Sequence, residues 1–287
     1  MANTRQIKGR INTAANISKI TKALEMVSAS KMRRAQMQAL ATRPYTRAIQ
    51  NSLQKVAERI DSSIHPLLST HQEGKDVLVL FSTDRGLCGG LNTNLFKSTG
   101  HWADDRQNIS LIVIGKKAVT FAKKTGLPVL AQFTGLPEQL SVQDILPIST
   151  LVTNGFLSKE YRSVWLLHMD FINTLSQKAK FTQLLPLNAE NLLGEATSTA
   201  QSEYLFEPNP QQILNELLPY YLENTLYQTL LEAKASEHSA RMVAMKNASD
   251  NAKSLVSELK LIFNKSRQAT ITNELLDITT ATMTVNS

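Results

Sequence analysis

The sequence predicts an α/β protein in which one mixed domain lies between two long helices that pack on each other. Ten of the eleven glycines lie between Gly74 and Gly194, and neither glycine nor proline follows Pro219. Glycine and proline mark turns because their backbone angles interrupt helices. Apolar stripes at helical spacing run through both ends of the chain, and short β-rich runs alternate with helical patterns in its middle.

Residues 1–60 are predicted to form the N-terminal helix. Apolar residues recur there at spacings of three or four, at Ile7, Ile11, Ala14, Ile17, Ile20, Leu24 and Val27. A helix of about 55 residues would be about 80 Å long, which exceeds a globular domain. Since a lone helix in water cannot bury its apolar stripe, we expect it to pack on the C-terminal helix, with a bend at Pro44.

Strand and helix signals alternate in the middle segment, residues 74–193, and predict a largely parallel sheet. Helical character lies at Lys116–Lys124 and over residues 142–162, with a break near Pro147. Residues 194–203 are small and polar, as in a surface loop. Short apolar runs predict strands at Val77–Phe81, Ser110–Ile114, Pro128–Phe133 and Val164–Phe171, with Phe181–Leu187 as a further candidate.

Residues 208–287 are predicted to form the C-terminal helix. A 4-3-4-3 heptad rhythm is carried by Ala248, Ala252, Leu255, Leu259 and Ile262. Residues 233–252 are rich in alanine and serine, which would let two helix backbones approach closely. The two terminal helices are therefore expected to pair through these stripes.

The charge of the chain is concentrated in its first 60 residues. They carry twelve basic and two acidic side chains, a net +10, so the other residues must sum to −3 for the whole chain to reach +7. A basic arm favours an anionic partner such as nucleic acid, a membrane or an acidic protein surface. No apolar run is long enough to cross a membrane and no secretory signal is visible, so we expect a soluble intracellular protein.

The sequence offers no independent catalytic site. The five histidines lack ligand spacing, and neither a GxSxG nor a Walker A motif occurs. The single cysteine, Cys88, excludes an internal disulfide and has no visible neighbouring base. A loop with Gly86, Gly89 and Gly90 follows the first strand, but its spacing is not GxGxxG, so a tight strand-to-helix turn is favoured over a phosphate cradle. We expect no catalytic residue, no metal site and no cofactor.

Four segments resemble the gamma subunit of F-type ATP synthases, in family order. They are Ile17–Arg33, Thr83–Asn92, Ala240–Asn251 and Asn264–Leu275, whereas residues 95–200 match only in layout. The resemblance implies an antiparallel coiled coil of the two terminal helices and a central Rossmann-like domain that binds no nucleotide.

The resemblance also implies a function: the central-stalk rotor subunit, itself non-catalytic, of a proton- or sodium-translocating ATP synthase. Such a subunit couples ion flow through the c-ring to ATP synthesis and hydrolysis at the beta subunits. The implied partners are three alpha and three beta subunits, the epsilon subunit and the c-ring, without nucleic acid. Membrane contact is expected only through the c-ring, at the cytoplasmic face of a bacterial inner membrane.

By motif match, the resemblance implies two sets of contact residues. Tyr204 and Glu207 resemble the foot that faces the c-ring and epsilon. Where the family usually ends its C-terminal signature in Gly-Ala, this chain has Ala281 and Thr282. The beta-subunit contacts are implied at Arg267, Gln268, Thr272, Glu274, Leu24 and Met26.

Part of the basic arm could also meet acidic surface on the beta subunits. At 100° per residue, six basic residues fall within an arc of about 120°. A solvated helix face is the alternative, because exposed ion pairs contribute little. These residues are Lys19, Lys22, Arg33 and Arg34, together with Arg5 and Lys8.

Two other functions fit parts of the sequence. A nucleic-acid-binding coiled coil would use the basic arm, but that arm holds one aromatic residue, Tyr45, for base stacking. An oxidoreductase would use the α/β domain, but the GxGxxG fingerprint is absent.

Overall fold

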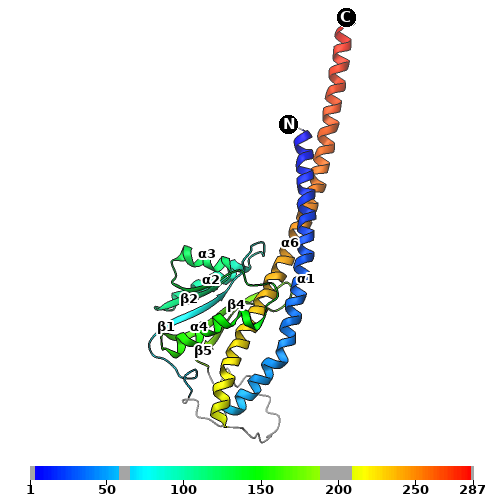
Figure 1. Cartoon of the computed structure of the whole chain (residues 1–287). Helices are drawn as coiled ribbons and strands as arrows, with labels where there is room; N and C mark the ends of the chain where they lie inside the picture. Colours follow the sequence, from blue (N-terminus) through cyan, green and yellow to red (C-terminus); the bar gives the residue numbers. More distant parts are fainter. Residues whose placement is uncertain (1–3, 58–64, 188–208, 286–287) are drawn as a thin grey trace. The chain divides into compact units, whose positions relative to one another are not determined.

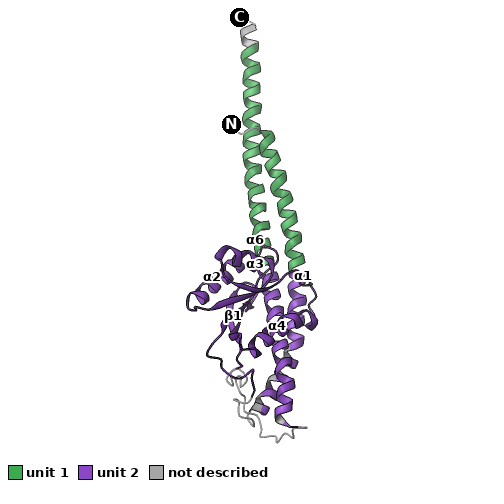
Figure 2. Cartoon of the chain, turned by 60° about the vertical axis from the view of Figure 1, so that its left-hand side comes forward, with its two compact units in different colours: residues 1–28, 241–287 green, residues 29–240 purple. Residues whose placement is uncertain are grey.

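The computed structural model describes residues 4–57, 65–187 and 209–285. Two long helices, α1 (Thr4–Ala57) and α6 (Pro210–Val285), flank a five-stranded sheet and its shorter helices in the sequence (Figure 1). The chain divides into a paired-helix unit, residues 1–28 with 241–287, and a sheet unit, residues 29–240 (Figure 2). The long terminal helices and the central mixed sheet confirm the predicted fold class.

The sheet has the strand order β3-β2-β1-β4-β5. β1, β2, β3 and β4 pair in parallel, and β5 runs antiparallel to β4 at one edge. The largely parallel sheet is thus confirmed, and its antiparallel edge strand is an addition to the prediction. The strands are β1 (Lys75–Phe81), β2 (Ile109–Ile114), β3 (Val129–Phe133), β4 (Tyr161–Phe171) and β5 (Gln177–Leu185).

Helices cover both faces of the sheet, so its central strands are buried on both sides. Along β1, Leu78 and Leu80 join the core under α2 (Leu91–Asp104) and α3 (Lys116–Thr125). Val77 and Val79 point the other way, since successive side chains of a strand alternate between faces. That second core is closed by α4 (Leu146–Leu157) and by the parts of α1 and α6 that belong to the sheet unit. Burial on both faces explains the near-continuous apolar runs of these strands.

The helix expected over residues 142–162 is wrong in extent. The structure has a short 3-10 helix, η2 (Val142–Asp144), then α4, and β4 begins at Tyr161. Pro147 lies in the first turn of α4, where a missing backbone N–H costs no helical hydrogen bond. Lys159, with φ of 62°, reverses the chain after α4, so the residues that follow belong to the strand.

Side-chain hydrogen bonds join α1 to α6 in the sheet unit, on both sides of Pro44. Thr42 Oγ1 donates to Gln228 Oε1 at 2.6 Å, and Asn224 Nδ2 donates to Thr46 Oγ1 at 2.7 Å. α1 continues as one helix through this proline. These bonds satisfy polar groups where the regular backbone ladder of α1 is interrupted.

Asp76 anchors the start of β1 from a buried position. It accepts hydrogen bonds from the Arg162 guanidinium and from Ser163 Oγ. Burial by itself would raise the pKa of Asp76, but these bonds and the charges of Arg162 and Arg106 lower it overall. Asp76 therefore stays ionised at neutral pH and ties β1 to β4.

Gly155 in α4 is required by close packing rather than by backbone conformation. A methyl group at this position would collide with the ring of Tyr161, the buried first residue of β4. Gly100 in α2 provides a contrast, because a methyl group there would meet nothing within 4 Å. The two helical glycines therefore differ in what surrounds them.

We expect Gly155→Ala to lower the free energy of unfolding by about 1–3 kcal/mol, because the ring of Tyr161 must move to make room. Gly100→Ala is the matched control and is expected to stabilise α2 by up to about 1 kcal/mol. Chemical denaturation of both variants, followed by circular dichroism, measures the difference. Equal stability of the two variants would contradict the packing argument.

Candidate functional site

The paired-helix unit consists of two helical segments that run side by side in opposite directions (Figures 1 and 2). Ser18 Oγ donates to the carbonyl of Ser249 at 3.3 Å, and Ser249 Oγ donates to the carbonyl of Ser18 at the same distance. Each side chain thus reaches the main chain of the facing helix. Such an approach is possible only where side chains at the contact are small.

The face of α1 that is turned inward repeats with a 4-3 rhythm. Buried or half-buried side chains occur at Ile7, Ile11, Ala14, Ser18, Thr21, Glu25 and Ser28. A spacing of 3.5 residues keeps one face of a helix against its partner over several turns. Beyond Ala14 this face is built mainly from small polar residues rather than from large apolar ones.

The stripe predicted on α1 is therefore wrong beyond Ala14. Ile17, Ile20, Leu24 and Val27 are 48%, 60%, 36% and 51% exposed. Each precedes an inward-facing residue by one position, which turns it by about 100° away from the contact. The signal that could have found the contact is the 3.5-residue recurrence of small residues.

On α6 the inward-facing residues also recur at spacings of three or four, and here too part of the predicted stripe is wrong. Leu255 and Ile262, both predicted to face inward, are 47% and 46% exposed, whereas Ala252 is buried as predicted. The inward face is formed by Met245, Ser249, Ala252, Val256, Leu259, Phe263 and Ser266. Buried or half-buried positions end at Ser266, and every side chain from 267 to 281 is exposed.

The exposed stretch 267–281 holds four of the implied beta-subunit contacts, Arg267, Gln268, Thr272 and Glu274. Thr272 Oγ1 donates to the backbone carbonyl of Gln268 at 2.9 Å, and the side chain of Gln268 is exposed. Large apolar side chains in the same stretch are also uncovered. They are Ile271, Leu275, Leu276 and Ile278, which are 48%, 58%, 58% and 60% exposed.

The implied contacts on the first part of α1 are exposed as well. Met26 is 60% exposed, and Lys19 and Lys22 lie on the surface near Leu24 in the sequence. Lys22 Nζ forms an ion pair of 3.0 Å with Glu25. The charge of Lys22 is thus partly compensated within its own helix.

The structure assigns Arg33 and Arg34 to the sheet unit, and Lys19 and Lys22 to the paired-helix unit. Both arginines are exposed. Arg34 borders a cavity of about 350 Å³ that is also lined by Lys31, Glu138 and Lys234. The predicted basic face is thus divided between two units rather than gathered on one of them.

Glu138 is the acidic centre of that cavity. Its carboxylate lies 3.0 Å from Lys31 Nζ and 2.9 Å from His238 Nε2. Burial would raise the pKa of Glu138, but the hydrogen bond from Lys31 and the charges of His238, Lys31 and Lys234 lower it overall.

The glycine loop joins β1 to α2. Gly90 stands at the N-cap of α2, and Gly89 has a φ of +59°, which a side chain would strain. Asn92 ties the loop together, because its Nδ2 donates to Thr83 Oγ1 at 2.8 Å and to Cys88 Sγ at 3.3 Å. Gly86 lies in the same loop, beside the Lys117 side chain.

The Asp84 carboxylate lies beside this loop, at the helix N-terminus where a phosphate group would be expected to bind. Asp84 accepts a hydrogen bond from the backbone N–H of Lys116, at the start of α3, at 3.0 Å, and one from Gly135 N–H at 3.3 Å. Helix N-termini attract anions, and here the anion is a side chain of the chain itself. An incoming phosphate would meet its negative charge.

Tyr204 and Glu207, the implied foot residues, lie outside the residues that the structure describes.

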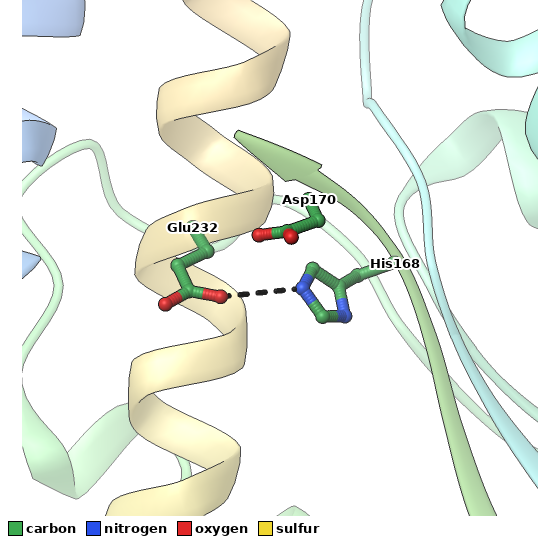
Figure 3. A group of neighbouring side chains, drawn as sticks. All are labelled: His168, Asp170 and Glu232. Atoms are coloured by element: carbon green, nitrogen blue, oxygen red, sulfur yellow. Dashed lines mark ion pairs between the residues drawn. The ribbon is translucent and has the colours of Figure 1, made fainter. Parts of the chain in front are cut away.

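One polar cluster lies at the contact between β4 and α6 in the sheet unit. His168 and Asp170 come from β4 and Glu232 from α6, and Figure 3 shows both carboxylates facing the imidazole. His168 Nε2 lies 3.4 Å from Glu232 Oε2, and one ligand atom from each residue lies within 4.8 Å of the others. His168 is 2% exposed, and neither ring nitrogen has a hydrogen-bond partner among the described residues.

Sequence reasoning missed this cluster, having expected only dispersed histidines. Burial would raise the pKa of Glu232, but its close contact with His168, the hydrogen bond from Gln228 and the charge of Lys180 lower it overall. A usable signal did exist: His168 and Asp170 alternate on an apolar strand and so share one face. Glu232 could not have been added from spacing, because it belongs to a different element.

The comparisons with known proteins identify the family. The family model described as ATP synthase matches residues 3–285. An ATP synthase gamma chain of Akkermansia muciniphila is 43% identical over 289 residues, which cover 98% of each chain. One of Herpetosiphon aurantiacus is 42% identical over 298 residues, which cover 100% of each. The chain belongs to the ATP synthase gamma chain family.

Solved structures of the family share the fold. A chain from the central stalk and c-ring structure of the Tetrahymena thermophila mitochondrial ATP synthase is 26% identical with a TM-score of 0.62, and the match covers 80% of this chain and 99% of that one. A chain of the Euglena gracilis mitochondrial ATP synthase is 20% identical with a TM-score of 0.67, covering 98% and 94%. These relatives give the nucleic-acid-binding alternative no support.

Within the described residues of this gamma-family chain, no helix is long and apolar enough to cross a membrane.

We expect Ser18→Cys with Ser249→Cys to form an intramolecular disulfide under mild oxidation, because these hydroxyl oxygens lie 3.4 Å apart. Cys88→Ala serves as the background, and thiol titration of the unfolded, unreduced protein measures the bond. Ile17→Cys with Ser249→Cys is the matched control, since Ile17 faces outward. Equally fast bonding in the control would contradict the observed register.

Proposed function

We propose that the chain is the central-stalk rotor subunit of an F-type ATP synthase and couples ion flow through the c-ring to ATP synthesis and hydrolysis at the beta subunits. Family membership over residues 3–285 supports the assignment. The single observation in the structure that carries it is the stretch 267–281 of α6, whose side chains, including large apolar ones, are all exposed. An exposed apolar surface of this kind marks a contact with partner proteins.

The proposed role of the shaft is to interact differently with each of the three catalytic sites at any one time. A partner shifts the equilibrium between two states of a site only if it interacts differently with each state. The helical surface of the paired-helix unit is asymmetric, since arginine and amide groups at 267–268 lie next to apolar groups. Turning such a surface past three identical beta subunits would press on each of them differently in turn.

We propose that the chain itself is non-catalytic and that the beta subunits carry out the chemistry. One observation supports this proposal. The backbone N–H of Lys116, beside the glycine loop, already donates a hydrogen bond to the Asp84 carboxylate, so it is not available to a phosphate group. Three alpha and three beta subunits, epsilon and the c-ring are the proposed partners. The proposed place is peripheral, at the cytoplasmic face of a bacterial inner membrane.

The three parts expected from the sequence are retained as proposed functional parts. Residues 1–60 and 208–287 would form the shaft, and residues 74–193 would be the central α/β domain. The contacts proposed with beta are Arg267, Gln268, Thr272, Glu274, Leu24 and Met26, with Lys19, Lys22, Arg33 and Arg34 as the basic contribution. The foot is proposed to include Tyr204 and Glu207.

We expect Arg267→Ala and Gln268→Ala each to lower coupled turnover of the assembled complex several-fold, because each removes hydrogen-bond donors from the proposed contact, and those of Arg267 are charged and therefore stronger. Stability of the isolated chain should change by less than about 0.5 kcal/mol, since both side chains are exposed. ATP hydrolysis and ATP-driven ion pumping by reconstituted complexes measure the effect. Lys260→Ala, exposed on the same helix, is the control, and wild-type rates in both test variants would remove these residues from the proposed contact.

We expect replacing Lys19, Lys22, Arg33 and Arg34 together by glutamine to weaken binding to the alpha–beta ring by roughly tenfold or more at low salt, since exposed pairs are each worth about 0.2–1 kcal/mol. Each single change should be mild. Because salt screens exposed charges, the binding affinity of the wild-type chain should fall more steeply with ionic strength than that of the variant. The affinity of both chains for the alpha–beta ring is measured over a series of salt concentrations. If the two chains show the same salt dependence, the four basic residues form a solvated face and the prediction is wrong.

A further inference from the structure

The cluster of His168, Asp170 and Glu232 contains a buried imidazole whose ring nitrogens form no hydrogen bond among the described residues. His168 is 2% exposed, and both ring nitrogens lack a hydrogen-bond partner among the described residues. Buried polar atoms normally have partners, because an unpaired one loses the free energy of its hydration. The contact that His168 makes with Glu232 is a 3.4 Å ion pair rather than a hydrogen bond, so the two ring nitrogens need a physical explanation.

One distance within the cluster matches the separation of two ligands around a small cation. His168 Nε2 and Glu232 Oε2 are 3.4 Å apart, a separation at which no hydrogen bond is formed here. Two ligand atoms that each lie about 2.1 Å from a tetrahedral ion are separated by about 3.4 Å. One ligand atom of Asp170 completes the group, and the three atoms lie within 4.8 Å of one another. A small inward movement of one carboxylate would bring all three into coordination.

The chemistry of the donors selects the kind of ion. An imidazole nitrogen suits first-row transition ions, whereas Mg²⁺ and Ca²⁺ take mainly oxygen ligands. Two carboxylates and one neutral imidazole provide a net charge of −2 for a divalent ion. Among the described residues, this is the one group of three histidine, cysteine, aspartate or glutamate side chains close enough to share an ion.

Two basic residues oppose a cation at this position. Lys180 on β5 stands opposite His168 in the sheet, and its charge acts on Glu232. Lys178 stands opposite Asp170 in the same ladder. The positive charge of Lys180 therefore competes with a cation for the carboxylate of Glu232, and removing this charge should favour cation binding.

We propose that His168, Asp170 and Glu232 form a binding site for a divalent transition-metal ion of the Zn²⁺ type. Three protein ligands would leave a fourth tetrahedral position for water. The ion would join β4 to α6 within the sheet unit, because the ligands come from these two elements. The site does not depend on the proposed rotor function, and its role would be to fix the C-terminal helix to the sheet.

The test is calorimetric titration of the full chain, freed of metal by a chelator, with Zn²⁺ and separately with Mg²⁺. We expect one Zn²⁺ per chain, with a dissociation constant in the micromolar range or below, and no saturable binding of Mg²⁺. Saturating Zn²⁺ should raise the melting temperature by about 5 °C or more, because a ligand that binds only the folded state stabilises it. Co²⁺ should give the visible absorption of a four-coordinate site.

Variants show whether these residues are the ligands. Asp170→Asn and Glu232→Gln should each weaken Zn²⁺ binding at least about tenfold, and His168→Gln should abolish the Co²⁺ absorption. Lys180→Gln should tighten binding several-fold, since it removes a competing charge. His238→Gln is the matched control, because His238 is also a buried histidine beside a glutamate, Glu138, but belongs to no group of three among the described residues.

Two results would overturn the proposal. One is the absence of saturable Zn²⁺ binding to a chain whose circular dichroism shows it to be folded. The other is binding that Asp170→Asn and Glu232→Gln leave as tight as His238→Gln does. If His168→Gln does not fold, the two carboxylate variants and Lys180→Gln still decide the matter, because they alter the site from different sides and in opposite directions.

Discussion

The close approach of two helix backbones in the paired-helix unit is the constraint on which its outer surface depends. Ser18 and Ser249 exchange hydrogen bonds with each other's main chain, so the residues at the contact must be small. At that point of contact large side chains would separate the helices, although Met245 and Phe263 take inward positions elsewhere on α6. Other large side chains lie outside the contact, and Ile20, Val27 and Leu255 are exposed. The packing that joins the helices thus also produces an apolar exterior available to partners.

In the sheet unit, two carboxylates join neighbouring elements by accepting hydrogen bonds from them. Asp76 ties β1 to Arg162 and Ser163 on β4, and Asp84 bonds to the backbone N–H at the start of α3. Each is compensated by nearby donors, as buried or partly buried charges must be. In a nucleotide-binding relative of this fold class, the end of the first strand commonly serves the ligand. Here Asp84, Asn92 and Thr83 use the donors of that region for the protein's own structure.

These two arrangements support one functional interpretation. The proposed rotor function agrees with both features, because Asp84 accepts the backbone hydrogen bond at the start of α3 and the side chains of 267–281 on α6 are exposed to partners. The cluster of His168, Asp170 and Glu232 fits the same view, because an ion there would strengthen the attachment of α6 to the sheet.

The sequence by itself determined the element order and the family. The scarcity of glycine and proline in residues 1–60 and after Pro219 indicates the two long helical regions, because these residues usually interrupt helices. Their exact bounds did not follow, since Pro44 and Pro219 lie inside α1 and α6. Apolar runs such as Val77–Phe81 predicted the central strands, since a strand buried on both faces must be apolar throughout. Four motifs in order then sufficed to indicate the gamma chain family.

Only the tertiary structure decided which side of each helix faces inward and which polar residues meet. A spacing of three or four residues fits two neighbouring faces of a helix equally well, and the packing of Ser18 against Ser249 chose the one with small residues. His168 and Glu232 come from a strand and a distant helix, so no local pattern connects them. Their meeting is set by how α6 lies on the sheet, which depends on the whole buried core rather than on any single segment.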